Sequence, residues 1–104
     1  SFWGAALGME LRQLPADEAH RYVQLVDPQD RLHVEVQTVT HASRVHLDIE
    51  TDDIEAEVSR LEALGATRVA QVSTWWVMQA PTGHRFCVVR KSSPNFALDA
   101  RQWP

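Results

Sequence analysis

Apolar and polar residues alternate along several short stretches of this chain, and the alternation predicts β-strands. A period of two residues is typical of a strand with one buried face. The clearest example runs from Leu32 to Val39, where apolar residues occupy every second position through Val36. By this pattern and by composition we expect strands at residues 9–14, 22–26, 32–39, 44–50, 66–72, 75–79 and 85–90.

A different spacing in the middle of the chain predicts an amphipathic helix. Apolar residues recur at helical intervals to form one stripe: Ile54, Val58, Leu61 and Leu64. Asp52 is the expected N-cap, with Glu55 three positions later completing a capping box, and Gly65 ends the helix. A shorter helix is expected at 1–7, ended by Gly8, a residue suited to the left-handed conformation.

The order of these elements indicates an internal repeat. Gly65 follows Gly8 by 57 positions, and the turns at Pro28 and Pro81 lie 53 positions apart. We expect a first module at 1–43, a second at 44–90 and a tail at 91–104, which together form one domain. The first module lacks an opening strand. We therefore expect either residues that precede Ser1 or another chain to cover its free strand edge.

Composition and charge narrow the classes of partner. The chain has 104 residues, is 44% hydrophobic, and carries a net charge of −4. Its ten basic residues are scattered, which argues against nucleic-acid binding. No apolar run approaches the roughly 20 residues of a membrane helix, and Phe2 to Met9 does not have the pattern of a signal peptide. The single cysteine, Cys87, excludes an internal disulfide and favours a cytoplasmic location.

Four stretches together resemble the vicinal oxygen chelate superfamily, in its bacterial glyoxalase-like branch of glyoxalase, bleomycin resistance and dioxygenase domains. They are RVHLDIETDDIEAEVSRLEALGATRV and WWVMQAPTGHRFCVV in the second module, with FWGAALGMEL and LHVEVQTV in the first. The resemblance implies an α+β fold of two βαβββ modules, whose curved mixed sheets enclose a cavity. It also implies a small-molecule ligand, a divalent metal ion in many members, and a homodimer.

The resemblance also implies where metal ligands would lie, since metal-using members take one from the first and one from the last strand of each module. His46 matches the first-strand position of the second module. The last-strand position falls on Cys87 in the second module and on Gln37 in the first, with Glu35 two residues earlier. Catalytic relatives commonly carry a glutamate at that position beyond a DPDG-like turn, whereas this chain has APTG followed by Cys87.

Independently of the family resemblance, strand alternation indicates a polar pocket. It places His33, Glu35 and Gln37 on one face of their strand, and His46 and Asp48 on the polar face of the next. Buried polar groups are costly unless they are hydrated, paired or bound to a ligand.

A metal site of His46, Glu35 and Gln37 would suit a hard or borderline divalent ion, and adding Cys87 would favour zinc. The alternatives are a hydrogen-bonded core histidine at His46 and a small buried apolar residue at Cys87.

The tryptophan pair Trp75 and Trp76 offers an apolar wall to an aromatic ligand. Alternation places Trp76 with Met78 on one face and Trp75 on the other, so at least one of them belongs to the core. We include Trp76 among the expected pocket residues.

These observations support more than one function. The first is a small-molecule-binding protein that acts as a metal-dependent lyase or isomerase, with Glu35 as the base. The second is a non-catalytic binder of hydrophobic or aromatic compounds, of the bleomycin-resistance type, with no cofactor. The third is a structural or partner-binding remnant.

Overall fold

The computed structural model describes residues 2–13, 22–29 and 31–104. The chain divides into two compact units. Unit 1 consists of Ser1–Ser43 and Ser93–Pro104, and unit 2 consists of Arg44–Ser92. Both units combine helix with sheet, so the predicted α+β class is confirmed. Whether the modules at 1–43 and 44–90 and the tail at 91–104 together form one domain stays a prediction.

Unit 1 is built on a three-stranded antiparallel sheet in the order β1-β2-β3. Its elements are α1 (Phe2–Leu7), β1 (Glu10–Gln13), β2 (Tyr22–Val26), β3 (His33–Gln37) and α3 (Phe96–Asp99). Every residue of β3 pairs with one of β2, and this limits β3 to five of the eight residues expected at 32–39. Leu25 of β2 is 1% exposed and is the main core side chain of this unit. The short helix α3 was not predicted.

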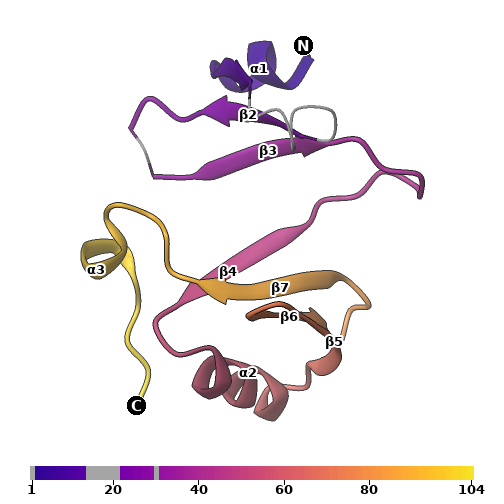
Figure 1. Ribbon diagram of the computed structural model, residues 1–104, viewed down its shortest axis with the longest axis vertical. Helices are drawn as coiled ribbons and strands as arrows, with labels where there is room; N and C mark the ends of the chain where they lie inside the picture. The colour runs from indigo at the N-terminus through magenta and orange to yellow at the C-terminus, as the bar shows by residue number, and fades with distance from the viewer. Residues whose placement is uncertain (1, 14–21, 30) are drawn as a thin grey trace. The chain divides into compact units, whose positions relative to one another are not determined.

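Unit 2 contains a complete βαβββ module (Figure 1). Its elements are β4 (Leu47–Thr51), α2 (Ile54–Ala63), β5 (Thr67–Val72), β6 (Trp75–Gln79) and β7 (Arg85–Arg90). The sheet order is β4-β7-β6-β5, with β4 parallel to β7 and the other pairs antiparallel. The α2 helix lies across one face of this sheet and connects β4 at one edge to β5 at the other.

The α2 helix begins one residue later than the capping prediction implied. Asp53, not Asp52, is the N-cap, because its backbone is extended and its carboxylate accepts a hydrogen bond from the Ala56 amide at 3.0 Å. The Thr51 hydroxyl accepts from the Asp53 amide at 3.1 Å, which holds the cap in place. The prediction of a capping box from Asp52 and Glu55 is therefore wrong.

The core of unit 2 lies between α2 and the sheet. Its buried members come from one helix and two strands and are Val58, Met78, Phe86 and Val88. Each fully buried side chain of this size stabilises the fold by roughly 1.5–3 kcal/mol. Leu64, expected in the apolar stripe of the helix, is 67% exposed, because it is the C-cap residue and lies past the last buried turn.

The first strand of unit 2 starts later than the pattern at 44–50 predicted. Its pairing with β7 begins at Leu47 opposite Phe86, and residues 44–46 precede the ladder. Val45 is 76% exposed, so the alternation that includes it does not mark a buried face. His46 therefore lies immediately before β4.

The repeat is visible in the two element orders. The series helix, strand, strand, strand occurs as α1 to β3 in unit 1 and as α2 to β7 in unit 2. Gly8 and Gly65, which end the two helices, have φ of 66° and 109°. A side chain at Gly65 would be strained by its backbone and would approach Pro81 Cγ to 3.1 Å. In the described residues unit 1 starts with α1 and shows no strand before it, in line with the predicted fold.

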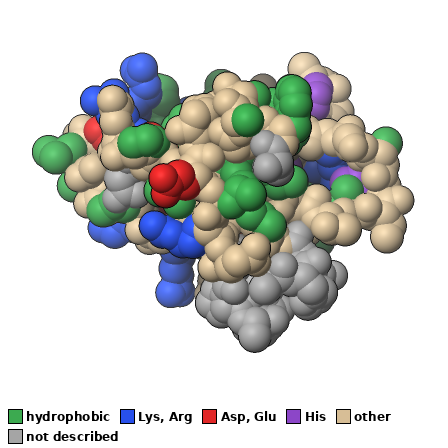
Figure 2. Space-filling model, turned by 90° about the horizontal axis from the view of Figure 1, so that it is seen from above, with side chains coloured by type: hydrophobic (Ala, Val, Ile, Leu, Met, Phe, Trp, Pro, Cys, Tyr) green, Lys and Arg blue, Asp and Glu red, His purple; other side chains and the backbone are tan. Residues whose placement is uncertain are grey.

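Large apolar side chains reach the surface in several places. Figure 2, seen from the α1 end of Figure 1, shows hydrophobic side chains interspersed with polar ones. In α1 itself Phe2 is 73% exposed and Trp3 53%, with their rings in edge-to-face contact. Among the described residues, no helix has both the length and the apolar character needed to cross a membrane.

Candidate functional site

The face of the unit 2 sheet that points away from α2 carries three of the six polar residues that the sequence singled out. Residues paired in a ladder share a face, and neighbours along a strand point to opposite faces. Since Phe86, Met78 and Val88 pack under α2, the alternate residues face the other way. We call this set the open face; its members are Asp48, Glu50, Trp75, Val77, Gln79, Arg85, Cys87 and Val89.

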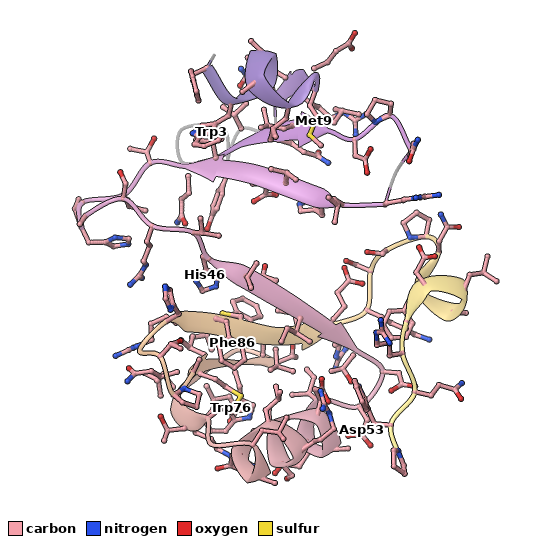
Figure 3. The ribbon with its side chains drawn as sticks, turned by 180° about the vertical axis from the view of Figure 1, so that it is seen from behind. Trp3, Met9, His46, Asp53, Trp76 and Phe86 are labelled. Atoms are coloured by element: carbon pink, nitrogen blue, oxygen red, sulfur yellow. The ribbon has the colours of Figure 1, made fainter. Side chains whose placement is uncertain are left out.

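Three potential metal ligands meet on the open face. Asp48 lies opposite Cys87 in the ladder between β4 and β7. His46 joins them from the residues before β4, and its Nε2 lies 3.3 Å from Asp48 Oδ1. One ligand atom from each of the three residues lies within 4.8 Å of the other two. In Figure 3, His46 lies at the start of β4, whereas Phe86 and Trp76 lie toward α2.

Burial and charge keep the thiol of this cluster protonated. Cys87 is only 9% exposed, and burial raises the pKa of its thiol because a thiolate is poorly solvated there. The nearby Asp48 carboxylate raises this pKa further through charge repulsion. His46 and Asp48 are exposed, so the cluster is open on one side. A bound cation would reverse the effect of the carboxylate and favour the thiolate.

The remaining polar candidates lie in unit 1. His33, Glu35 and Gln37 occupy alternate positions of β3, which places them on one face. A hydrogen bond of 2.7 Å joins His33 Nε2 and Glu35 Oε1. The structure thus brings Glu35 together with His33, and His46 together with Asp48 and Cys87. The predicted metal set of His46, Glu35 and Gln37 spans both units and stays a prediction.

Trp76 lies on the α2 side of the sheet, across from the open face. It packs against the core beside Met78, and the Arg68 guanidinium lies 4.9 Å from the centre of its ring. It also lines an open hollow of about 620 Å³ near the start of α2 and the turn at Ser73 and Thr74. The structure therefore does not bring Trp76 together with Cys87.

Sequence reasoning did not select the residues that surround the three ligands on the open face. Trp75 and Val77 lie on this face of β6, and Arg85 flanks Cys87 on β7. Because β6 and β7 carry apolar residues on both faces, the sequence pattern did not show which face belongs to the core and which is the open face. The alternation of Arg85, Cys87 and Val89 with Phe86 and Val88 was the available signal, but it needed the position of α2 to be interpreted.

A βαβββ module with a possible ligand set next to its first and last strands is the arrangement that the family resemblance implied. Residues 1–89 match the family described as the glyoxalase-like domain. The chain belongs to the glyoxalase-like domain family. A search of curated protein sequences found no match.

Solved structures similar to this glyoxalase-like domain have low identity to it. One is the antibiotic-binding protein TnmS3 from Streptomyces sp. CB03234, with 19% identity, 88% of this chain and 82% of that chain covered, and a TM-score of 0.39. Another is the trypanothione-dependent glyoxalase I of Leishmania major, with 18% identity, 86% and 73% covered, and a TM-score of 0.41. At these values neither one assigns a ligand or a reaction to this domain.

Proposed function

We propose that this glyoxalase-like domain binds a small molecule on the open face of unit 2, beside a divalent metal ion held by His46, Asp48 and Cys87. The observation that carries the proposal is the convergence of an imidazole, a carboxylate and a thiol from two neighbouring segments within 4.8 Å. Within the described part of the chain, none of these three side chains forms an ion pair with a lysine or arginine.

The chemistry of the three side chains fits a zinc-like ion. Nitrogen, oxygen and sulfur are the atoms that bind Zn²⁺ in proteins. Catalytic zinc sites commonly use three protein ligands and leave a further position for water or substrate. The buried thiol and the exposed imidazole and carboxylate give a site that is closed beneath and accessible from solvent.

Such an ion would act as a Lewis acid toward an oxygen of the ligand, the chemistry on which a metal-dependent lyase or isomerase relies. The protein's own residues would position the ligand and exclude water. The base predicted from the sequence, Glu35, belongs to unit 1, where its carboxylate is hydrogen-bonded to His33. A base must come within hydrogen-bond reach of the proton that it removes, directly or through one water.

A non-catalytic binder of hydrophobic or aromatic compounds is the second candidate. The apolar side chains of the open face favour it, because Trp75, Val77 and Val89 lie beside Cys87 and are only half-buried. An aromatic ligand would gain by covering this apolar surface. The two candidates share one face and differ in whether the ion is required.

Cobalt binding separates the two candidates. Added to the metal-free protein, Co²⁺ should bind more tightly than about 1 μM and show the near-ultraviolet absorption of a thiolate bond, and Zn²⁺ should displace it. Cys87→Ser should abolish that absorption. His46→Ala should weaken binding by more than the roughly 10–100-fold that follows loss of a residue contacting a metal ligand.

His84→Ala is the matched control, since His84 is an exposed histidine of the same unit, hydrogen-bonded to Thr82 in the turn before β7. It should leave Co²⁺ binding unchanged. If the unmodified protein binds neither Co²⁺ nor Zn²⁺, the metal-dependent function is wrong. Binding of aromatic compounds to that metal-free protein would then support the second candidate.

A further inference from the structure

Arg85 stands on the open face two residues before Cys87. It pairs in register with Gln79 of β6, and its Nε donates a hydrogen bond to Gln79 Oε1 at 2.9 Å. Both side chains are half-buried, and the next residue, Phe86, points into the core under α2. The hydrogen bond and the strand pairing hold the guanidinium on the same side of the sheet as the thiol.

No carboxylate pairs with Arg85 among the residues that the structure describes. The half-buried arginines on the helix side differ, because Arg60 is paired with Glu57 and Arg68 with Glu55. A guanidinium has five N–H groups, of which Gln79 takes one.

The two carboxylates on the same face of β4 already have partners. Asp48 contacts His46, and Glu50 accepts a hydrogen bond from the Ser92 amide at 3.0 Å. A half-buried guanidinium without a counter-ion is suited to an anion, since its planar N–H groups match a carboxylate in a two-pronged hydrogen bond. The anion would therefore come from outside the described residues.

An apolar surface lies on the other side of Cys87. Val89 is two residues beyond it on β7, and Trp75 stands two residues before Val77, the partner of Cys87 on β6. Arg85 and Val89 are four residues apart, which is about 13 Å along a strand. Along the direction of β7, the open face thus presents first a cation, then a potential metal site and then an apolar surface.

We propose that the open face recognises an aromatic carboxylate, with the carboxylate on Arg85 and the ring over Trp75. The inference rests on the proposed function, since it names the class of ligand that lies beside the His46, Asp48 and Cys87 cluster. The order of the groups favours a ligand that carries its charge at one end and its ring at the other. A neutral aromatic compound would leave the guanidinium desolvated and unpaired, which is unfavourable.

Calorimetric titration with 2-naphthoate and its neutral amide, 2-naphthamide, tests the assignment. The protein should bind the carboxylate about ten-fold or more tightly than the amide, the change expected for one charge-assisted hydrogen-bonded pair. Arg85→Gln should remove this difference, and Arg85→Lys should retain part of it. Trp75→Leu should weaken both probes by a similar factor.

Arg90→Gln is the matched control, because Arg90 lies on the same strand and, by alternation, on the opposite face. It should leave the ratio of the two affinities unchanged. Equal affinities in the unmodified protein, no binding of either probe, or a ratio that survives Arg85→Gln would each overturn the inference. Circular dichroism of each variant establishes that it is folded.

Cobalt binding distinguishes this inference from the proposed function. Arg85→Gln should leave the thiolate–Co²⁺ absorption intact, since Arg85 is not a ligand. If Co²⁺ binds but the carboxylate has no advantage over the amide, the ligand class is wrong and the metal site stands. If the carboxylate is preferred but Co²⁺ does not bind, the metal site is wrong and the ligand class stands.

Discussion

Asp48 of β4 lies directly opposite Cys87 of β7 in the parallel ladder of unit 2. This places a carboxylate next to the only thiol of the chain. Burial raises the pKa of the thiol, and the carboxylate raises it further. Both effects disfavour the thiolate in the absence of a cation, and the thiolate is the reactive form of cysteine.

Removing the carboxylate should make Cys87 more reactive. In metal-free Asp48→Asn, the pKa of Cys87 should fall, while burial still holds it above its ordinary value. The pH at which iodoacetamide alkylation reaches half its maximal rate should move downward. Asp52→Asn, an exposed acid of the same unit, is the control and should leave the profile in place. An unchanged profile in Asp48→Asn would show that the Asp48 carboxylate does not act on the thiol.

The helix cap predicts a difference between two adjacent aspartates. Asp53→Ala should lower the free energy of unfolding by about 1 kcal/mol, because the Ala56 amide loses its acceptor. Asp52→Ala should change it by less than about 0.5 kcal/mol. Urea denaturation of the two variants measures the difference. A larger loss in Asp52→Ala than in Asp53→Ala would contradict the assigned cap.

Two valines of unit 2 should respond differently to the same truncation. Val88 is 0% exposed and Val72 is 42% exposed. Val88→Ala should cost about 2–3 kcal/mol through lost burial and the cavity that remains. Val72→Ala should cost less than about 1 kcal/mol. Equal losses of unfolding free energy would show that the core between α2 and the sheet does not dominate the stability of this unit.

The Glu55–Arg68 pair predicts a dependence of stability on acid pH. A hydrogen-bonded ion pair of 2.6 Å with Arg68 holds the pKa of Glu55 below its ordinary value of 4.5. A carboxylate whose pKa is lowered by folding stabilises the folded state above its unfolded pKa, and this contribution disappears as the pH falls through the folded pKa.

The unmodified protein should therefore be more stable than Glu55→Gln at neutral pH, and the gap should close below pH 4.5. Thermal unfolding midpoints across this range measure the gap, and salt should reduce it, since the pair is exposed. Glu10→Gln, which removes a carboxylate at an exposed strand position outside the pair, is the control variant. A gap that persists in strong acid would exclude the ion pair as its source.

Local patterns predicted much of the fold correctly. The strands Tyr22–Val26, Trp75–Gln79 and Arg85–Arg90 appear at the expected residues. Alternation and turn residues act over a few positions, so a single sequence can specify such elements. The repeated Gly8 and Gly65, both with positive φ, depend on backbone sterics that are equally local.

The start of β4 depended on a partner far along the chain, and the helix cap on a side-chain hydrogen bond two residues away. Leu47 is the first residue of β4 because Phe86 is its first partner on β7, some 40 residues later. Asp53 caps α2 in preference to Asp52 because the Thr51 hydroxyl holds the Asp53 amide. Both choices follow from contacts that the hydropathy pattern does not contain.

By itself the sequence determined the class of elements, their order and the repeat, since these follow from periodicity and backbone geometry. It also indicated His46, Asp48 and Cys87 as candidate site residues. Only the tertiary structure decided that these three meet, and that Trp75 and Arg85 rather than Trp76 share their face. The physical reason is that α2 buries one side of a sheet whose strands β6 and β7 carry apolar residues on both sides. Which side the helix covers is settled by packing between segments distant in the chain.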